Sequence, residues 1–158
     1  MMTAKPHLYP VEIRWTGNTG QGTQRYQAYD RAYTITATGK PTIEASADPA
    51  FRGDKTKYNP EELLVASLSS CHMLWYLHLC AESQVIVTHY VDYPVGTLLE
   101  TSDGRGQFTK VLLRPTVTIT PESNQRLAVD LHQQAHKQCF IANSVNFPVP
   151  CNPSVHKG

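Results

Sequence analysis

The sequence predicts an α+β fold in which antiparallel strands surround one long buried central helix. Residues 63–81 form a run without Asp, Glu, Lys or Arg, which is typical of a helix buried inside a fold. Short segments rich in β-branched residues lie before and after this run, separated by Gly, Pro and Asn. Strands therefore come before and after a helix instead of alternating regularly with helices, which favours α+β over a parallel βαβ fold.

Three strands are predicted before the helix, at residues 8–15, 31–37 and 42–47. A polar, Gly-rich segment at residues 16–24 suits a turn or loop between the first two strands. Gly39 and Pro41 indicate a hairpin turn between the second and third strands. The charged segment 48–58 is predicted to be a loop that leads into the helix.

The start of the central helix has a clear signal. Asn59 is a good N-cap, Pro60 fits the first helical position, and Glu62 can complete an arrangement similar to a capping box. Glu61 is then left without a capping role. We expect the helix to end near Glu82 or the residue after it.

The apolar run also has nearly the length of a membrane span, which needs about 20 apolar residues. Several features disfavour that alternative. The run lacks a basic flank, with Glu61 and Glu62 before it and Glu82 after it. It also contains five polar side chains: Ser67, Ser69, Ser70, His72 and His78. We therefore expect a helix inside a soluble fold and no membrane partner.

The C-terminal half is predicted to contain more strands and a second helix. Residues 84–93 and 108–119 are β-rich, and the intervening segment 102–107 has turn chemistry. The second helix is capped by Thr120, starts with the following proline and runs to about Gln138. A short helix or turn should follow it. The last segment holds three prolines, so any strand there is short and lies at a sheet edge.

Length and composition narrow the class of protein. A chain of 158 residues is expected to form a single domain, residues 1–158. A net charge of +1 without a strongly basic stretch disfavours nucleic-acid binding. The N-terminus lacks the apolar segment of a secretion signal. Four cysteines without a CxxC pair do not form a disulfide framework, so we expect free thiols and a cytoplasmic location.

The four cysteines differ in how well their positions suit a catalytic role. Cys71 lies in the middle of the central helix, and Cys80, nine positions later, falls on roughly the opposite face. A buried cysteine is a packing residue by default. Cys139 lies at the end of the second helix, a more exposed kind of position, and its plainest interpretation is a surface or half-buried thiol. We interpret Cys80 and Cys151 as structural.

The segment NPEELLVASLSSC, which contains Glu61 and Cys71, resembles the signature of the OsmC/Ohr family, the osmotically inducible and organic-hydroperoxide-resistance proteins. The family pattern has Asn-Pro-Glu and then a mostly apolar helix, with a cysteine ten residues after the glutamate. A second cysteine after a later helix matches Cys139. The resemblance extends from about Glu12 to Val155, and CHMLWYLHLCA is similar to a less characterised branch of the family.

The resemblance implies an intertwined homodimer and a two-cysteine peroxidase. Cys71 would be oxidised to a sulfenic acid by an organic hydroperoxide or by hydrogen peroxide, and Cys139 would then form a disulfide with it. An external dithiol would reduce that bond. Only a thiolate attacks peroxide, and the pKa of a free thiol is near 8.5, so a cation beside the sulfur is needed.

Arg52, in the loop before the helix, is the first candidate for this cation, with Arg31 and Arg25 as alternatives. A carboxylate close to the sulfur would disfavour a thiolate. Glu61 is therefore expected to act indirectly, by orienting the arginine.

Other interpretations of the same residues remain open. Cys71, His72, His136 and Cys139 have the composition of a zinc site, but adjacent helical residues point about 100° apart, so we predict no metal and no other cofactor. A cysteine hydrolase with His72 or His136 as base is one alternative. A stress-associated binding protein of the same fold is another. The remaining histidines and aromatic residues are interpreted as core, strand or surface positions: His78 and His89 as core or strand, His132 as surface, and Trp75, Tyr76 and Phe140 as core.

Overall fold

The computed structural model describes residues 5–158, which divide between Glu61 and Glu62 into two compact units. The first unit holds a three-stranded antiparallel sheet of β1 (Glu12–Trp15), β2 (Tyr33–Thr36) and β3 (Ile43–Ala45), in that order, followed by the 3₁₀ turn η1 (Pro49–Phe51). The predicted hairpin between β2 and β3 is confirmed, with Gly39 in the left-handed region at φ 75°. β1 is shorter than predicted at its N-terminal end.

The second unit begins within the long helix α1 (Pro60–Glu82), whose bounds agree with the prediction. The helix ends in a Schellman motif. Gln84 adopts the left-handed conformation at φ 58°, and the N–H of Val85 donates to the carbonyl of Cys80 at 2.9 Å. This turn directs the chain back along the helix.

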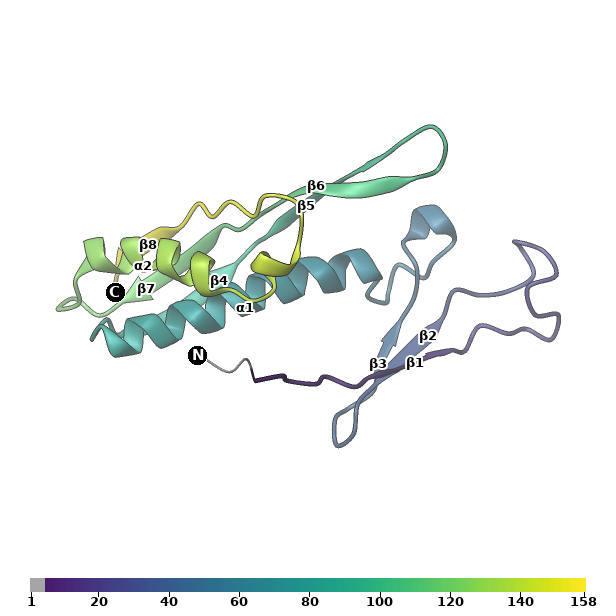
Figure 1. Ribbon diagram of the computed structural model, residues 1–158, viewed down its shortest axis with the longest axis horizontal. Coiled ribbons are helices and arrows are strands. Elements are labelled where there is room, and N and C mark those ends of the chain that lie inside the picture. Colours follow the sequence, from purple (N-terminus) through teal and green to yellow (C-terminus); the bar gives the residue numbers. More distant parts are fainter. Residues whose placement is uncertain (1–4) are drawn as a thin grey trace. The chain divides into compact units, whose positions relative to one another are not determined.

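The strands of the second unit form two small sheets. The first has the order β4 (Val87–Asp92), β7 (Pro115–Ile119) and β8 (Ser154–Lys157), with β8 parallel to β7 at the edge. The second is the hairpin of β5 (Val95–Glu100) and β6 (Gly106–Leu112), drawn as the long extension in Figure 1. The sequence does not predict β5 as a separate strand, because its residues fall between the two β-rich segments.

Helix α2 (Gln125–Gln138) begins four residues later than predicted. The side chain of Asn124, not Thr120, caps the helix by accepting from the N–H of Leu127 at 3.0 Å. Thr120 instead forms a turn in which its carbonyl accepts from the N–H of Ser123 at 3.1 Å. The predicted short helix after α2 is η2 (Ala142–Ser144).

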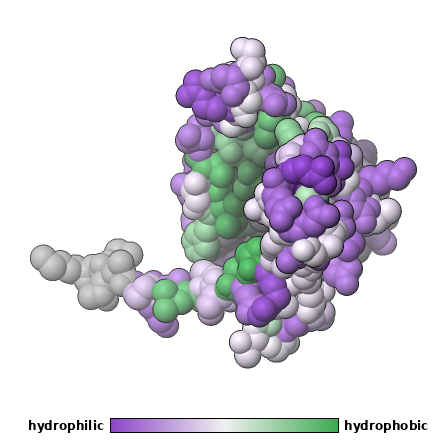
Figure 2. Space-filling model, turned by 90° about the vertical axis from the view of Figure 1, so that its right-hand side faces the viewer, coloured by the Kyte–Doolittle hydropathy of each residue, from purple (hydrophilic) through white to green (hydrophobic). Residues whose placement is uncertain are grey.

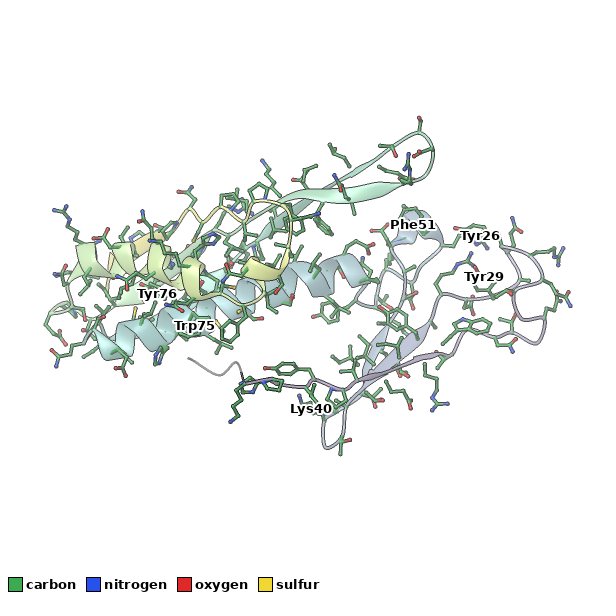
Figure 3. All side chains as sticks on the ribbon, viewed as in Figure 1. Tyr26, Tyr29, Lys40, Phe51, Trp75 and Tyr76 are labelled. Atoms are coloured by element: carbon green, nitrogen blue, oxygen red, sulfur yellow. The ribbon has the colours of Figure 1, made fainter. Side chains whose placement is uncertain are left out.

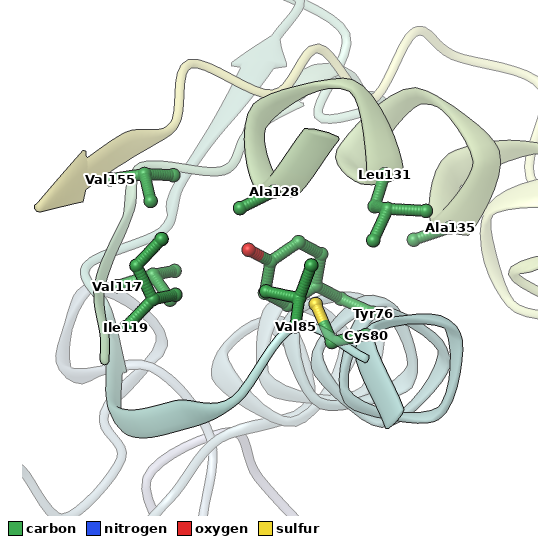
Figure 4. Packing of buried hydrophobic residues seen from close by; sticks show 9 residues of the cluster. All are labelled: Tyr76, Cys80, Val85, Val117, Ile119, Ala128, Leu131, Ala135 and Val155. Carbon is green, nitrogen blue, oxygen red and sulfur yellow. The ribbon is translucent and has the colours of Figure 1, made fainter. Parts of the chain in front are cut away.

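The main core lies where α1, α2 and the β4–β7–β8 sheet meet (Figure 4). Leu131 and Ala135 of α2 face Tyr76 and Cys80 of α1, and residues of β7 and β8 close the cluster. A second cluster packs the first half of α1 on β6 and the segment after η2; its buried members are Leu68, Val111, Leu113 and Val149.

Helix α1 is not covered on all sides within the chain. Its fully buried residues recur at every fourth position and form one stripe: Leu68, His72, Tyr76 and Cys80. Leu74, on another face, is 63% exposed. By length and composition α1 also meets the criterion for a membrane-spanning helix, which core helices of soluble proteins meet as well. The expected all-round burial is therefore not confirmed for the single chain.

Candidate functional site

The side chains of Cys71 and Cys139 meet in the second unit. Cys71 lies in the middle of α1 and is partly buried, whereas Cys139 is the C-cap residue of α2 and is 1% exposed. The Cys71 thiol lies close enough to Cys139 to raise the pKa of the Cys139 thiol. Both are free thiols, as are Cys80 and Cys151. The predicted redox residues are thus brought together from two helices.

Cys139 is fully buried, whereas the sequence predicts a surface or half-buried thiol. The turn η2 folds back over the end of α2, so that the N–H of Asn143 donates to the carbonyl of Cys139 at 3.0 Å. The hydroxyl of Ser144 donates to the carbonyl of Phe140 at 2.7 Å. Phe140, which was expected in the core, is exposed instead.

The surroundings of Cys139 favour its protonated form. Burial raises the pKa of its thiol well above the usual range, and the neighbouring Cys71 raises it further. The N–H of Ala142 lies 3.4 Å from the Cys139 sulfur and opposes this effect by donating to it. Cys139 is therefore a thiol at neutral pH. Of the two residues, Cys71 is the more accessible.

Two aromatic rings flank the thiol pair. Trp75 follows Cys71 by one helical turn, on the same side of α1, and Phe140 follows Cys139 directly. Their ring centroids are 5.6 Å apart with planes at 84°, an edge-to-face contact. The ring of His78 also contacts Trp75 edge to face, with centroids 5.7 Å apart. His78 is exposed, so its predicted core position is wrong.

A polar contact that the sequence does not indicate ties α1 to β4. The hydroxyl of Ser69 donates to one oxygen of Asp92 at 2.5 Å, and the N–H of Arg114 donates to the other at 2.7 Å. The Arg114 guanidinium turns away to the carbonyl of Tyr93 at 2.9 Å. Asp92 places a negative charge near His72, whose pKa it raises slightly against the effect of burial.

His132 is 2% exposed, so its predicted surface position is wrong. Its Nδ1 lies 3.0 Å from Nε2 of His72, which is 1% exposed, and its ring stacks on Tyr76 with centroids 3.8 Å apart. Burial is the main cause that lowers the pKa of His72 to about 4 and that of His132 to about 3. Both rings are therefore neutral at physiological pH.

In the first unit, Arg31 is held firmly in place. Its guanidinium donates to the carbonyls of Tyr29 at 2.6 Å and Tyr26 at 2.7 Å, and it lies 4.1–4.2 Å from both ring centroids. Figure 3 shows the two tyrosines close together in this unit. These contacts hold the Arg31 guanidinium against the loop that contains Tyr26 and Tyr29.

Arg52 and Glu61 have fewer partners in the same unit. Arg52 follows η1 with a left-handed backbone, φ 66°, and its guanidinium is 5.9 Å from the Tyr26 ring centroid. Oε2 of Glu61 is buried and accepts no hydrogen bond within residues 5–158. Burial and then the charge of Glu61 raise the pKa of Tyr33. Arg25 lies in an exposed bend.

Comparison with protein families gives a match to the OsmC-like protein family over residues 53–154. Comparison with curated proteins gives no match. Among solved structures, an OsmC-like protein of unknown function from Vibrio cholerae is 34% identical with a TM-score of 0.84, over 94% of this chain and 99% of that one.

Two organic hydroperoxide resistance proteins share the fold at lower identity. The protein from Elizabethkingia anophelis, solved with thiocyanate bound, is 17% identical with a TM-score of 0.67, over 98% of this chain and all of that one. The protein from Legionella pneumophila is 19% identical with a TM-score of 0.66, over 95% and 98% of the two chains.

Proposed function

The chain belongs to the OsmC-like protein family, whose members have peroxidase-like or stress-related roles, and from this premise we propose that it is a two-cysteine hydroperoxide reductase. Cys71 reduces an organic hydroperoxide and Cys139 resolves the oxidised sulfur. The observation that carries the proposal is that these two thiols, which lie on different helices, are near enough for Cys71 to raise the pKa of Cys139.

The first step takes place at the more accessible sulfur. The Cys71 thiolate attacks one peroxide oxygen, the O–O bond breaks, and the alkoxide leaves with a proton as an alcohol. Sulfur provides both electrons of the new S–O bond. The peroxide is thereby reduced, and Cys71 becomes a sulfenic acid.

The second step uses the buried thiol. The Cys139 thiolate attacks the Cys71 sulfur, an S–S bond forms, and the sulfenic oxygen leaves with a proton as water. Disulfide geometry requires Cα atoms about 4.4–6.8 Å apart. Cys139 begins an irregular segment in which η2 is the only regular element before β8, so a local shift there can close the bond. An external dithiol then restores both thiols.

The aromatic pair beside the thiols supports an organic substrate. Trp75 and Phe140 offer an apolar surface next to Cys71 and Cys139, and apolar walls are typical of sites that bind organic groups. An alkyl or aryl hydroperoxide would bury its hydrocarbon part there. Hydrogen peroxide has no such part and would gain nothing from these rings.

Arg52 is the cation proposed to favour the Cys71 thiolate, with Glu61 as the residue that orients it. Support comes from within the first unit. Arg31 is already bound by Tyr26 and Tyr29, whereas one oxygen of Glu61 has no hydrogen-bond partner among the residues described.

The family also suggests a homodimer, and the exposed apolar side chains agree with this. Leu74, Trp75 and His78 line a hollow of about 260 Å³ on the uncovered side of α1. Figure 2 shows further apolar side chains at the surface on the face that it draws. A second copy of the chain would cover such surfaces, and light scattering during gel filtration would measure the resulting mass.

The proposal is tested by treating the reduced protein with one equivalent of cumene hydroperoxide and mapping its peptides without reduction. We expect a Cys71–Cys139 disulfide and one equivalent of the alcohol product. A hydrolase or a binding protein would not require this bond. Recovery of Cys71 bonded to Cys80, or of Cys139 bonded to Cys151, would contradict the assigned resolving residue.

A further inference from the structure

A second cluster of ligating side chains lies beside the thiol pair. His72 of α1, His132 of α2 and Cys151, in the segment before β8, each direct one ligand atom to the same place. Nε2 of His72 and Nδ1 of His132 are 3.0 Å apart. The Cys151 sulfur lies 3.6 Å from the first nitrogen and 4.0 Å from the second. The proposed peroxidase chemistry uses none of these residues.

The two imidazole rings meet edge to edge. Their planes are nearly parallel, at 6°, but their centroids are 5.3 Å apart while the facing nitrogens are separated by only 3.0 Å. The rings therefore share one proton between facing nitrogens and are not stacked face to face. A change of tautomer, in which that proton moves to the outer nitrogen of its own ring, would leave two nitrogen lone pairs and the Cys151 sulfur around one point.

The outer nitrogens of the same rings are unusual. Nδ1 of His72 and Nε2 of His132 are buried and have no hydrogen-bond partner within residues 5–158. A buried polar atom without a partner costs about 1–3 kcal/mol.

The distances fit a metal of moderate size. Zinc binds histidine nitrogen at about 2.0–2.1 Å and cysteine sulfur at about 2.3 Å, in tetrahedral geometry. These lengths correspond to nitrogens about 3.3 Å apart and nitrogen–sulfur separations of about 3.5 Å. The observed separations lie within about 0.5 Å of these values. Each ring would rotate by about 35° to turn its lone pair from the facing nitrogen toward a common ion.

The chemistry of the three groups selects the metal. Two neutral imidazoles and a thiolate are nitrogen and sulfur ligands, which suit zinc and not the oxygen-seeking ions magnesium and calcium. Burial keeps both histidines neutral, the form that binds metal. Burial and then Asp92 raise the pKa of Cys151 to about 12, but a bound zinc ion displaces a thiol proton directly.

A path to the cluster is also present. His132 and Cys151 line a cavity of about 420 Å³ together with His136 and Lys137. The cavity gives an ion access from one side and leaves space for a fourth ligand. Cys71 would not supply that ligand, because it and His72 are adjacent on α1 and point about 100° apart.

We propose that His72, His132 and Cys151 form a zinc-binding site whose fourth position opens into this cavity. The site differs from the quartet of Cys71, His72, His136 and Cys139 considered from composition. It shares only His72 with that quartet.

The test uses the full chain with Cys71→Ser and Cys139→Ser, so that the redox thiols bind no metal and the result is independent of the proposed peroxidase. Equilibrium dialysis should give one zinc ion per chain. Cobalt, as a spectroscopic probe, should give the visible bands of tetrahedral coordination and a near-ultraviolet thiolate charge-transfer band.

Two further substitutions identify ligands, and a third serves as the control. Cys151→Ser should remove the charge-transfer band and weaken zinc binding by more than the 10–100-fold that loss of an outer-shell partner costs. His132→Gln, which keeps a polar side chain, should remove the tetrahedral spectrum. Cys80→Ser is the matched control, because Cys80 is a buried thiol on α1 that lies outside this cluster, and it should bind as the parent does.

Failure of the parent to bind one zinc ion per chain would overturn the proposal. So would a charge-transfer band that survives Cys151→Ser, or an equal loss of binding in Cys80→Ser.

Discussion

Two pairs of side chains join α1 to α2 in the second unit, and they differ in what surrounds them. Cys71 and Cys139 meet where one thiol is partly open and the other is buried next to an irregular segment. His72 and His132 meet inside the core, with both rings buried and Tyr76 stacked on one of them. Cys71 and His72 are adjacent in the chain, so a single turn of α1 serves both pairs.

The difference shows how one helix can direct a reactive thiol and a buried histidine to different surroundings. Adjacent helical residues point about 100° apart, which directs the thiol toward the end of α2 and the imidazole toward its middle. The thiol pair lies beside an irregular segment of the chain, where the Phe140 ring is exposed. The histidine pair lies where movement would break packing. If the thiol pair is reactive and the histidine pair is structural, substitutions in the two pairs should have different effects.

The largest effect should come from Cys71→Ser. A serine hydroxyl is not a comparable nucleophile toward peroxide, so hydroperoxide consumption with a dithiol should fall to the rate of buffer alone. Cys80→Ser changes a buried thiol on the same helix and should keep the parent rate. A coupled assay of peroxide loss compares the two variants, and near-parent activity in Cys71→Ser would remove the distinction between the pairs.

Cys139→Ser should stop turnover without stopping the first oxidation. One equivalent of peroxide should be consumed at the parent rate, since Cys71 remains. Without its partner, the sulfenic acid should persist and be oxidised further to sulfinic acid. Mass spectrometry of the Cys71 peptide measures this. Repeated turnover with an unmodified Cys71 would mean that the contact between the two thiols is not used.

The burial of Cys139 should make disulfide closure depend on pH. Its raised pKa leaves a small thiolate fraction at neutral pH, and that fraction grows as pH rises toward the pKa. Closure after the first oxidation should therefore speed up by about tenfold per pH unit between pH 7 and 9. Rapid quenching with an alkylating agent at fixed times measures closure, and a rate independent of pH would contradict the protonated state of Cys139.

The sequence predicts the helices better than their surroundings. The bounds of α1 follow from Asn59, Pro60 and the apolar run, because these signals are local. The start of α2 was placed wrongly, since Thr120-Pro121 and Asn124 are both acceptable starts and only the turn at Ser123 decides between them. Local sequence preference does not decide between two residues that can both serve as an N-cap.

Prediction of the candidate site was uneven for a similar reason. The spacing of Glu61 and Cys71 and the position of Cys139 after a helix are visible in the chain, whereas the burial of Cys139 depends on η2 folding back. His132 did have a signal: it falls with Ala128, Leu131 and Ala135 on the inward face of α2. Its contacts with His72 and Cys151 come only from tertiary packing, which spacing along one helix does not show.

The smallest effect expected here is on stability and concerns the histidine pair. His72→Leu leaves Nδ1 of His132 buried without its partner, which should lower the free energy of unfolding by about 1–3 kcal/mol. Replacing both histidines with leucine removes both polar groups, so the second substitution should cost less in the His72→Leu background than alone. Urea unfolding in the presence of a chelator measures the free energy of unfolding of His72→Leu, His132→Leu and the double variant. Cys71→Ser, at a partly buried position on the same turn of α1, is the reference. If the two substitutions were additive, His72 and His132 would not be energetically coupled in the folded protein.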